Sequence, residues 1–383
     1  MDKPKVSIIM PSLNVGPYIE ECIDSVLAQT LKEIEVICVD AGSTDGTLEK
    51  LQAYEQKDPR VHVVLSDRKS YGYQVNLGFD HAHGEYLGIV ETDDFAEPDM
   101  FEKLYTAAKK DDLDVCKAGF YFYWSKPEVK NVPSPIASEV MASRVFCPLT
   151  DFRAPLEQVD FFNIKPSIWS AIYRRSFIEE QGIRLNETPG ASFQDTAFNF
   201  KVYALAQRVR LLTDCVLHYR QDNEQSSINN PGKVYCLCDE YQVIDEFLDS
   251  HPELKGKLEG IKVRLKYDGY IWNVNRLDES LKMEFLGRAS QEFKHELEMG
   301  YADRECFVTY KWKAFLLIIQ DPAKFKEKGL DGIWAVDIEF DDDTKFMKLW
   351  KKINGGIYCI RDHGFVYTVK LAIDKLKNRQ NRE

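Results

Sequence analysis

The chain has 383 residues, of which 44% are hydrophobic, 29% charged and 12% aromatic. This composition is typical of a globular protein of two or three domains, and it excludes a disordered, collagen-like or small disulfide-stapled chain. The formal net charge is −12. Such acidity argues against a protein that binds the phosphate backbone of nucleic acid, so we expect no nucleic acid among the partners.

Cysteine usage and hydropathy indicate the cellular compartment of the protein. Its nine cysteines are odd in number and scattered, without a C-x-x-C motif, which favours reduced thiols over a disulfide framework. No apolar run approaches the roughly 18 residues that a membrane span needs, and the N-terminus lacks the long apolar stretch of a signal peptide. We therefore expect a cytoplasmic protein.

The first 124 residues alternate between strand and helix patterns. Apolar residues at helical spacing separate short runs rich in β-formers, which predicts βα units joined by right-handed crossovers. Such units build a mostly parallel, Rossmann-like sheet with flanking helices, so the expected fold class is α/β. The expected strands span residues 6–10, 35–39, 61–65, 86–90 and 115–122.

The pattern changes twice further along the chain. Prolines and mixed polar residues open the stretch 125–232, where we expect long loops with shorter strands and helices. Long stretches of 3.6-residue periodicity follow, which predict a C-terminal α-helical domain over residues 233–344. A basic amphipathic tail over residues 345–383 ends the chain. The expected domains are therefore 1–124, 125–232, 233–344 and 345–383.

Acidic residues follow two of the expected strands. Asp40 ends the second strand, and Glu91, Asp93 and Asp94 end the fourth. Ligands of open parallel sheets bind beyond the carboxyl ends of the strands, so these side chains face one crevice. Asp40 can accept the N3–H of a uracil beside the small Gly42, and the second group offers hard oxygen ligands for Mg²⁺ or Mn²⁺. Each group alone is better explained as a turn, but the two together favour a site.

Motifs of other nucleotide-binding families are missing from the sequence. No G-x-G-x-x-G follows the first strand, which argues against a dinucleotide oxidoreductase, and no G-x-x-x-x-G-K-[ST] indicates a P-loop NTPase. A divalent cation held by the carboxylates would let this acidic chain accept a diphosphate, because bare carboxylates repel phosphates.

An ordered series of short motifs resembles the family 2 glycosyltransferases of bacterial polysaccharide synthesis. It covers roughly residues 5–230, and its specificity comes from the order of the whole series. The resemblance implies a GT-A fold, an inverting mechanism and a nucleotide-sugar donor bound mainly by residues 1–124, with the acceptor bound by residues 125–232. The matching segments are residues 6–14, 23–30, 39–47, 76–78, 83–87 and 91–94.

The resemblance implies roles for individual residues. Glu91 stands where the family usually has Asp, and its longer side chain is still an oxygen ligand. A solvated loop acid is an equal interpretation of Asp67, and a packed strand histidine is the alternative for His218. The implied metal ligands are Glu91, Asp93, Asp94 and His218. The implied nucleotide-sugar contacts are Pro11, Asn14, Asp40, Gly42, Asp67, Asn76, Asp93, Arg220 and Ser226.

A motif in the second half of the chain implies a catalytic base. Residues 193–198 resemble the Glu-Asp motif of the family with Gln194 in place of Glu, so the role of general base passes to Asp195. An acid at a helix N-terminus is the alternative interpretation of Asp195. Trp169 matches a segment that flanks the acceptor site in relatives, where an aromatic face suits a sugar ring. Trp169 and Gln194 are therefore the expected acceptor contacts.

These expectations converge on one enzyme. A nucleotide sugar, expected to be UDP-linked, donates to a hydroxyl of a glycan or lipid-linked saccharide, with Mn²⁺ or Mg²⁺ as cofactor. Two alternatives stay open. A sugar nucleotidyltransferase would need a Gly-rich basic loop directly after the first strand, where Pro11–Asn14 stands instead. The second alternative is a catalytically degenerate glycan-binding or scaffold protein. Loss of catalysis would explain why Glu91 and Gln194 stand in place of the residues usual in the family.

The tail carries a charge opposite to that of the whole chain. Residues 345–383 hold ten basic and three acidic residues, with apolar side chains between them at helical spacing. A basic amphipathic segment suits an anionic membrane surface, which predicts peripheral association with the inner face of the cell membrane. A terminal helix packed on its domain is an equally weighted alternative. The helical extension is also compatible with a homo-oligomer.

Overall fold

The computed structural model describes residues 3–223 and 233–336. Ser226 and the basic tail 345–383 lie outside these ranges, so their predicted roles in phosphate and membrane binding stay predictions. The chain forms two compact units, residues 1–258 and residues 259–383. Helix α9 (Cys236–Ser250) belongs to the first unit, and the domain boundary expected at residue 232 stays a prediction.

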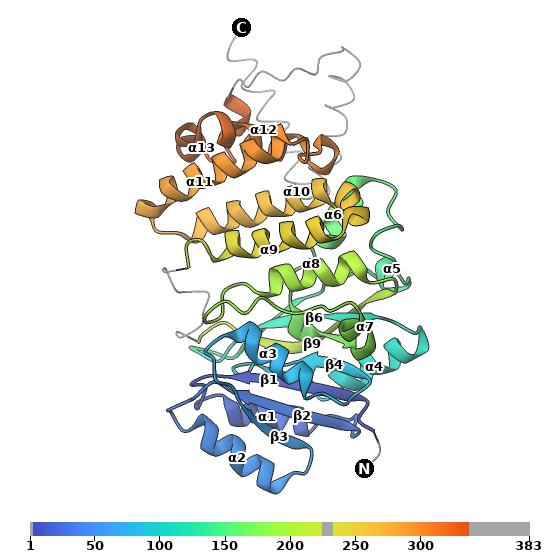
Figure 1. The fold of residues 1–383 in the computed structure, drawn as a ribbon. Helices are drawn as coiled ribbons and strands as arrows, with labels where there is room; N and C mark the ends of the chain where they lie inside the picture. Colours follow the sequence, from blue (N-terminus) through green and yellow to red (C-terminus); the bar gives the residue numbers. More distant parts are fainter. Residues whose placement is uncertain (1–2, 224–232, 337–383) are drawn as a thin grey trace. The chain divides into compact units, whose positions relative to one another are not determined.

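Four parallel strands form the N-terminal half of the sheet in the first unit (Figure 1). Every residue of β1 and β2 is buried, as expected for parallel strands covered on both faces. Ser12 pairs with Asp40, so these two strands end side by side. The predicted parallel arrangement is therefore confirmed for this half. In spatial order the strands are β3 (Val61–Leu65), β2 (Ile34–Asp40), β1 (Val6–Ser12) and β4 (Tyr86–Ile89).

Antiparallel pairing extends this sheet beyond β4 into a mixed sheet of nine strands within the described residues. β8 pairs antiparallel with both β4 and β6, β9 runs parallel to β6, and the short β5 lies antiparallel on β9. Residues 91–94, which we call the acidic turn, directly precede β5, so this pairing brings them beside the C-terminal end of β9. The strands are β5 (Phe95–Ala96), β6 (Val115–Trp124), β7 (Lys130–Ser134), β8 (Ala171–Arg174) and β9 (Val209–Arg220).

Helices pack on the sheet and on one another in this unit. Helix α3 packs on β1 and β2, α4 packs on β6, and α8 packs against α9 (Figure 1). The helices are α1 (Ile19–Leu27), α2 (Thr47–Lys57), α3 (Tyr71–Asp80), α4 (Met100–Lys110), α5 (Glu139–Ala142), α6 (Pro155–Phe162), α7 (Arg175–Glu180) and α8 (Asp195–Leu205), with the short 3₁₀ helix η1 (Ile168–Ser170) before β8.

A buried glutamate joins β1, β2 and the turn that precedes β4. The Glu35 carboxylate accepts hydrogen bonds from Ser7 Oγ at 2.5 Å, from the His83 N–H at 2.6 Å and from the Gly84 N–H at 3.0 Å. Bonds to an ionised acceptor are stronger than those between neutral groups. Glu35 is therefore a structural acid, at the end of the sheet opposite to the acids that follow the strands.

The second unit is helical, as predicted for the C-terminal region. Its core is aromatic, and the Phe315 ring centroid lies 4.9 Å from that of Phe293 and 5.3 Å from that of Phe307. Lys262 is buried, with its Nζ 2.9 Å from both carboxylate oxygens of Glu296. Among the described helices, none combines the length and the apolar character that a membrane crossing requires. The helices are α10 (Pro252–Arg276), which begins in the first unit, α11 (Glu279–Glu298), α12 (Thr309–Gln320) and α13 (Pro322–Lys328).

Helix α3 approaches the segment before α8 so closely that only glycine fits at position 72. A Cβ built on Gly72 would lie 1.9 Å from the backbone oxygen of Asn186. One turn further along α3, the Asn76 side chain donates to the Leu185 oxygen and accepts from the Leu185 N–H, each at 3.0 Å. Helix α3 therefore fixes the position of the chain that leads into α8.

We expect Gly72→Ala to lower the free energy of unfolding by about 1–3 kcal/mol, because the added methyl group collides with rigid backbone. Gly287→Ala is a matched control, since Gly287 lies inside α11 with nothing within 4 Å of an added Cβ. There the better helix propensity of alanine should raise stability by about 1 kcal/mol. Thermal unfolding measures both variants. A Gly72→Ala protein as stable as the natural chain would contradict this packing.

Candidate active site

Side-chain hydrogen bonds join the two loops that follow β1 and β2. The Asn14 N–H donates to Ser43 Oγ, and the Thr44 N–H donates to Asn14 Oδ1, each at 2.9 Å. The Gly16 N–H donates to Asp45 Oδ2 at 2.8 Å. Asn14 has a φ of 53°, a left-handed conformation that Asn adopts more readily than most residues. Asn14 is exposed, so it both organises the loops and stays open to the predicted nucleotide contact.

Asp40 shapes the second loop. Its Oδ1 accepts from the N–H groups of Gly42 and Ser43 at 2.9 Å each, and its Oδ2 accepts from Ser43 Oγ at 2.5 Å. Asp40 is 0% exposed, and its contact with a base stays a prediction. The carboxylate accepts from the Gly42 N–H, and Gly42 has a φ of 81° with nothing within 4 Å of an added Cβ. The open space at Gly42 is where a nucleotide could approach.

Buried hydrogen bonds connect these loops with the acidic turn. Gln74 Nε2 donates to the backbone oxygens of Ser12 at 2.9 Å and of Val39 at 2.7 Å. Thr92 Oγ1 donates to the Pro11 oxygen at 2.8 Å. Pro11 is buried in β1, so its role in this structure is to anchor the turn through its backbone. Gln74 was not among the residues expected from the sequence.

Two other predicted nucleotide contacts have contrasting surroundings. The Asp67 side chain is 76% exposed, and its contact with a nucleotide stays a prediction. The Asn76 amide is buried and fully used, because it bonds Leu185 as described above and donates to Glu187 Oε1 at 3.2 Å. Asn76 is thus a packing residue of α3, and its contact with the donor stays a prediction.

The acidic turn begins with a protonated or near-protonated glutamate. Burial, together with repulsion from Asp93 and Asp195, raises the pKa of Glu91 to about 8. The Tyr71 hydroxyl donates to Glu91 Oε1 at 2.5 Å, which partly offsets this rise. Because Tyr71 opens α3, the turn is tied to the same helix as the two loops.

The two aspartates of the turn differ in exposure. Asp93 is half-buried, and its Oδ2 accepts from Asn223 Nδ2 at 2.8 Å. Asp94 is buried, and its Oδ1 accepts from the Arg220 N–H at 2.8 Å. Asp94 Oδ2 has no hydrogen-bond donor within the described part of the chain. Burial and the neighbouring Asp93 hold the pKa of Asp94 well above its usual range.

Arg220 braces the acidic turn from the end of β9. Its Nε donates to the Asp93 backbone oxygen at 2.9 Å, and its Nη2 pairs with Glu21 at 2.5 Å. The guanidinium also lies 5.0 Å from the ring centroid of Tyr18 and 4.9 Å from that of Tyr123. These partners fix Asp93 and Asp94 through Arg220, and the contact of Arg220 with phosphate oxygens stays a prediction.

His218 is a packed strand histidine. Its Nδ1 lies 2.7 Å from Asn131 Oδ1, and its Nε2 lies 2.7 Å from Glu97 Oε1. The ring is stacked on Phe95, with centroids 4.3 Å apart. Both ring nitrogens therefore have partners, as the alternative stated for His218 expects, and its role as a metal ligand stays a prediction.

Asp195 begins α8 after a loop held by its neighbour Gln194. Gln194 is 1% exposed, and its Oε1 accepts from the Ser192 N–H at 2.5 Å. Its Nε2 donates to Thr188 Oγ1 at 2.9 Å and to the Gly190 oxygen at 3.0 Å. The Gln194 amide thus holds the loop that leads into Asp195, and its contact with an acceptor stays a prediction.

The Asp195 carboxylate belongs to the same electrostatic cluster as the acidic turn, although about a hundred residues separate them in sequence. Burial raises the pKa of Asp195 to about 6, while the cations Lys117 and Lys165 oppose the rise. Asp195 remains partly exposed. It is thus ionised near neutral pH, and it is accessible to an incoming group.

Three charged residues around Asp195 were missed by sequence reasoning. Lys117 is buried in β6, and the only signal was a lone lysine inside an otherwise apolar strand. Lys165 lies in the loop before η1 and faces aromatic rings. Glu240 comes from α9, where its Oε1 accepts from Asn186 Nδ2 at 3.0 Å and its Oε2 accepts from the Ala197 N–H at 3.4 Å. Glu240 thereby caps the first turn of α8.

Trp169 lies in an aromatic cluster beside this group. Its ring centroid lies 4.9 Å from that of Phe120 and 5.1 Å from that of Tyr219. Lys165 Nζ sits over the Phe120 ring at 4.7 Å and over the Tyr219 ring at 4.9 Å. Trp169 is only 7% exposed, so any acceptor contact would use its edge; that contact stays a prediction.

The carboxylate oxygens of the acidic turn are suitable ligands for a divalent cation. Carboxylates are the ligands that Mg²⁺ and Mn²⁺ prefer, and Asp94 Oδ2 is buried without a donor. Within residues 3–223 and 233–336, no three Asp, Glu, His or Cys side chains are arranged to hold a metal by themselves. Mg²⁺ commonly takes one or two carboxylates plus substrate phosphates, so the remaining ligands would come from a diphosphate.

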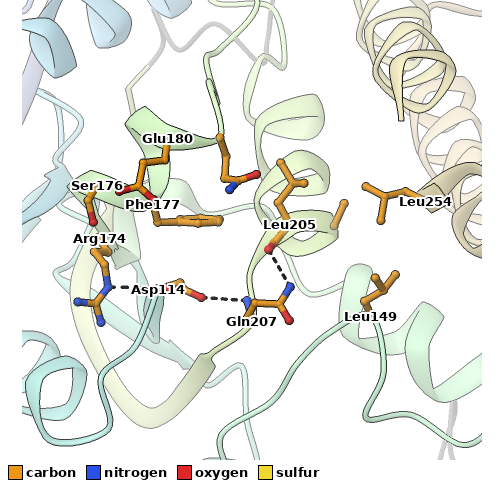
Figure 2. A pocket seen from close by; sticks show the side chains of 11 residues that line it. Asp114, Leu149, Arg174, Ser176, Phe177, Glu180, Leu205, Gln207 and Leu254 are labelled. Carbon is orange, nitrogen blue, oxygen red and sulfur yellow. Dashed lines mark hydrogen bonds and ion pairs between the residues drawn. The ribbon is translucent and has the colours of Figure 1, made fainter. Parts of the chain in front are cut away.

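A separate pocket of about 370 Å³ opens on another part of the first unit (Figure 2). Arg174 and Asp114 form its polar side, where the Gln207 N–H donates to Asp114 Oδ2 at 2.9 Å. Phe177 and Leu205 contribute to its apolar side. None of the predicted site residues lines this pocket, so the candidate active site is assigned from its chemistry and not from its depth.

Comparison with known families identifies the region of the chain that contains this site. Residues 7–201 match the model of glycosyl transferase family 2, and this span includes both the acidic turn and Asp195. The chain belongs to glycosyl transferase family 2. The family predicted from the motif series is thereby confirmed.

Relatives and solved structures are similar to different extents. The uncharacterised glycosyltransferase EpsJ of Bacillus subtilis is 32% identical over 219 residues, which cover 57% of this chain and 62% of EpsJ. The glycosyltransferase GlyG of Streptococcus pneumoniae is 39% identical over 119 residues, which cover 31% of this chain and 40% of GlyG. The chain thus spans less than two thirds of either relative. A solved chain of S. aureus TarS, residues 1–349, matches with a TM-score of 0.60 at 17% identity, covering 86% of this chain and 89% of that TarS chain, which confirms a GT-A-like fold.

We expect Arg220→Gln to lower the free energy of unfolding by about 1.5–3 kcal/mol, because it removes charged hydrogen bonds from a buried site. Arg68→Gln is the matched control, since its exposed ion pair with Glu187 should contribute less than about 1 kcal/mol. Denaturant unfolding measures both. Equal stability losses for the two variants would contradict the bracing role of Arg220.

Proposed function

We propose that this chain is a metal-dependent inverting glycosyltransferase that moves a sugar from a nucleotide sugar to a hydroxyl of a glycan or lipid-linked saccharide. The carrying observation is the gathering of the acidic turn and Asp195 into one electrostatic cluster at the carboxyl end of the sheet. Family membership supports the reaction class. The two joined loops after β1 and β2 supply an adjacent surface for the nucleotide.

The proposed reaction is a single displacement. Asp195 accepts the proton of the acceptor hydroxyl while that oxygen attacks the anomeric carbon of the donor sugar. The bond from this carbon to the diphosphate oxygen breaks at the same time, so the anomeric configuration inverts. A carboxylate whose pKa is about 6 suits this task, because it is ionised near neutral pH yet basic enough to bind a proton.

A uridine nucleotide is the proposed donor carrier. TarS, which shares the fold, has been solved with UDP and with UDP-GlcNAc. Escherichia coli chondroitin synthase is 39% identical over 108 residues, which cover 28% of this chain, and this supports a polysaccharide as acceptor. Exposed Asn14 and the open space at Gly42 are the proposed contacts of the nucleotide.

The proposed cation is Mn²⁺ or Mg²⁺, held by Asp93 and Asp94. When bound, it would stabilise the negative charge of the departing diphosphate. The acidic turn itself contributes two further effects. Arg220 keeps Asp93 and Asp94 in place through its backbone and guanidinium bonds, and Glu91 remains tied to Tyr71.

We expect Asp195→Asn to reduce transfer by about a hundredfold or more while UDP binding stays within about threefold, because the amide cannot accept the proton. UDP release from a panel of UDP-sugars with saccharide acceptors measures transfer, and calorimetry measures UDP binding. Asp80→Asn is the control, since Asp80 is an exposed partner of Arg184. Normal transfer by Asp195→Asn would exclude Asp195 as the base.

We expect a chelator to abolish transfer and added Mn²⁺ or Mg²⁺ to restore it, because the acidic turn repels the diphosphate without a cation. Asp93→Asn should raise the metal concentration needed for half-maximal rate by roughly tenfold, by analogy with the loss of one oxygen ligand. The rate is measured against metal concentration for both proteins. Full activity after chelation would overturn the proposed metal dependence.

A further inference from the structure

Three aromatic side chains follow one another along one face of strand β6. Phe120, Phe122 and Trp124 stand two residues apart, and side chains at this spacing point to the same face of a strand. The ring centroid of Phe122 lies 5.2 Å from that of Phe120 and 6.4 Å from that of Trp124. Phe120 is buried, but Phe122 and Trp124 are half-buried and keep part of their surface open to solvent. We call these three side chains the aromatic row.

Two neighbouring rings widen the row. Tyr219 of β9 is the partner of Phe122 in the sheet, and it is also half-buried. Its ring centroid lies 6.3 Å from that of Phe122 and 5.1 Å from that of Trp169. Half-open surfaces lined by aromatic rings are typical of ligand-binding sites.

Lys165 lies on this surface. Its Nζ is between 4.7 and 4.9 Å from the ring centroids of Phe120, Phe122 and Tyr219. The side chain is exposed, and no carboxylate of the described residues forms an ion pair with it. Ring faces attract a cation but carry no net charge, so they fix the ammonium group without neutralising it. Its positive charge therefore remains available to a ligand.

Lys130 repeats this arrangement at the end of the row. Its Nζ lies 5.2 Å from the ring centroid of Trp124. It is also exposed, and it also lacks an ion pair within residues 3–223 and 233–336. In contrast, Lys103 of α4 lies 2.9 Å from the carboxylates of both Asp99 and Asp214. The aromatic row is therefore a local site of positive charge in a chain whose net charge is −12.

The row borders the acidic turn. Tyr219 directly precedes Arg220, whose N–H donates to Asp94 Oδ1 at 2.8 Å. Burial against the rings lowers the pKa of Lys165, and the charges of Asp195 and Asp94 oppose this shift, which agrees with a position near both carboxylates. A ligand on the row would thus lie next to the proposed base.

We propose that the aromatic row and Lys165 form a subsite for an anionic saccharide. The rings contact the apolar faces of the sugar rings, and the Lys165 ammonium group pairs with a carboxylate or phosphate group of the saccharide. Lys130 provides a second positive charge along the same surface, so a chain with repeated negative groups fits it best. This inference rests on the proposed function in one respect, because it takes the saccharide as the acceptor of the transfer.

The donor diphosphate is the other source of an anionic group near Lys165. The proposed function assigns the diphosphate to the cation at Asp93 and Asp94. A diphosphate alone would also leave the far end of the row without a ligand, because the row continues along β6 to Trp124. We therefore assign Lys165 to the saccharide, and binding measurements distinguish the two sources.

The first experiment measures binding of two pairs of probes to the full chain by calorimetry. One pair is a uronic-acid-containing oligosaccharide and its carboxyl-reduced form, and the other is a phosphorylated oligosaccharide and its dephosphorylated form. The natural chain should bind the anionic member of at least one pair roughly tenfold more tightly, as expected for one charge-assisted contact. Added salt should reduce this preference, because the lysine is exposed. Equal affinity within both pairs, or no binding of any probe, would overturn the proposal.

Three variants test whether Lys165 causes the preference. Lys165→Met keeps an apolar side chain over the rings but removes the charge, so the preference should disappear while affinity for the neutral probe stays the same. Lys165→Arg should retain the preference, because a guanidinium also stacks on rings and stays charged. Lys57→Met is the matched control, since Lys57 is an exposed lysine of α2 whose Nζ lies 5.9 Å from the Tyr54 ring centroid, outside the row.

The control should bind all probes as the natural chain does. Full preference in a folded Lys165→Met protein, or an equal loss in Lys57→Met, would exclude the subsite. Lys165→Gln replaces the methionine variant if that protein does not fold.

The second experiment distinguishes the acceptor from the donor. Lys165→Met should bind UDP with Mn²⁺ as tightly as the natural chain does. In transfer assays it should raise the KM for the anionic acceptor by roughly tenfold and leave the KM for the UDP-sugar unchanged. Weaker UDP binding with unchanged saccharide binding would assign Lys165 to the donor and contradict the proposal.

Failure of this inference and failure of the proposed function give different results. Binding of an anionic saccharide that depends on Lys165, without UDP release from any UDP-sugar, would retain the subsite and exclude the proposed transfer. Transfer that is lost in Asp195→Asn, with saccharide binding and acceptor KM unchanged in Lys165→Met, would retain the proposed function and exclude the subsite.

Discussion

Repulsion among carboxylates gathered at one end of a sheet is the constraint on which the rest of this structure depends. Glu91, Asp94 and Asp195 all have raised pKa values, and burial is the leading cause for each. Such a cluster stays folded only if neighbouring groups supply positive charge or hydrogen-bond donors. The described residues do so with Arg220 at the acidic turn and with Lys117, whose charge favours the carboxylate of Asp195 at the start of α8. A bound cation would complete the same compensation.

Many polar side chains near the site hold backbone segments in place through hydrogen bonds. Asp40, Asn76 and Gln194 each spend their side chains on a loop or segment next to the site. Glu240 does so from α9, a helix of the first compact unit. The precision of the site comes from this supporting layer, because loops alone would leave the carboxylates free to move apart.

The sequence predicted the parallel half of the sheet most accurately, because the patterns that indicate its strands and helices depend on neighbouring residues. Apolar runs separated by helical spacing located β1 to β4, and acids directly after β4 located the acidic turn. The sequence did not predict which atoms these side chains meet within the chain. Asp40 has the residue type of a ligand contact but bonds the nearby Ser43, and His218 bonds Asn131 and Glu97, which are distant in sequence. Nothing in the local pattern distinguishes an acid that faces a ligand from one that closes a loop.

The sequence by itself determined the family, the parallel strands and the presence of acids at their carboxyl ends, because periodicity and ordered motifs depend on neighbouring residues. Tertiary structure alone decided which of those acids stand near one another and which cations balance them. Lys117 appears in the sequence only as a lone charge within an apolar strand. The protonation state of this buried lysine depends on the groups that folding brings near it, among them Asp195 at the start of α8.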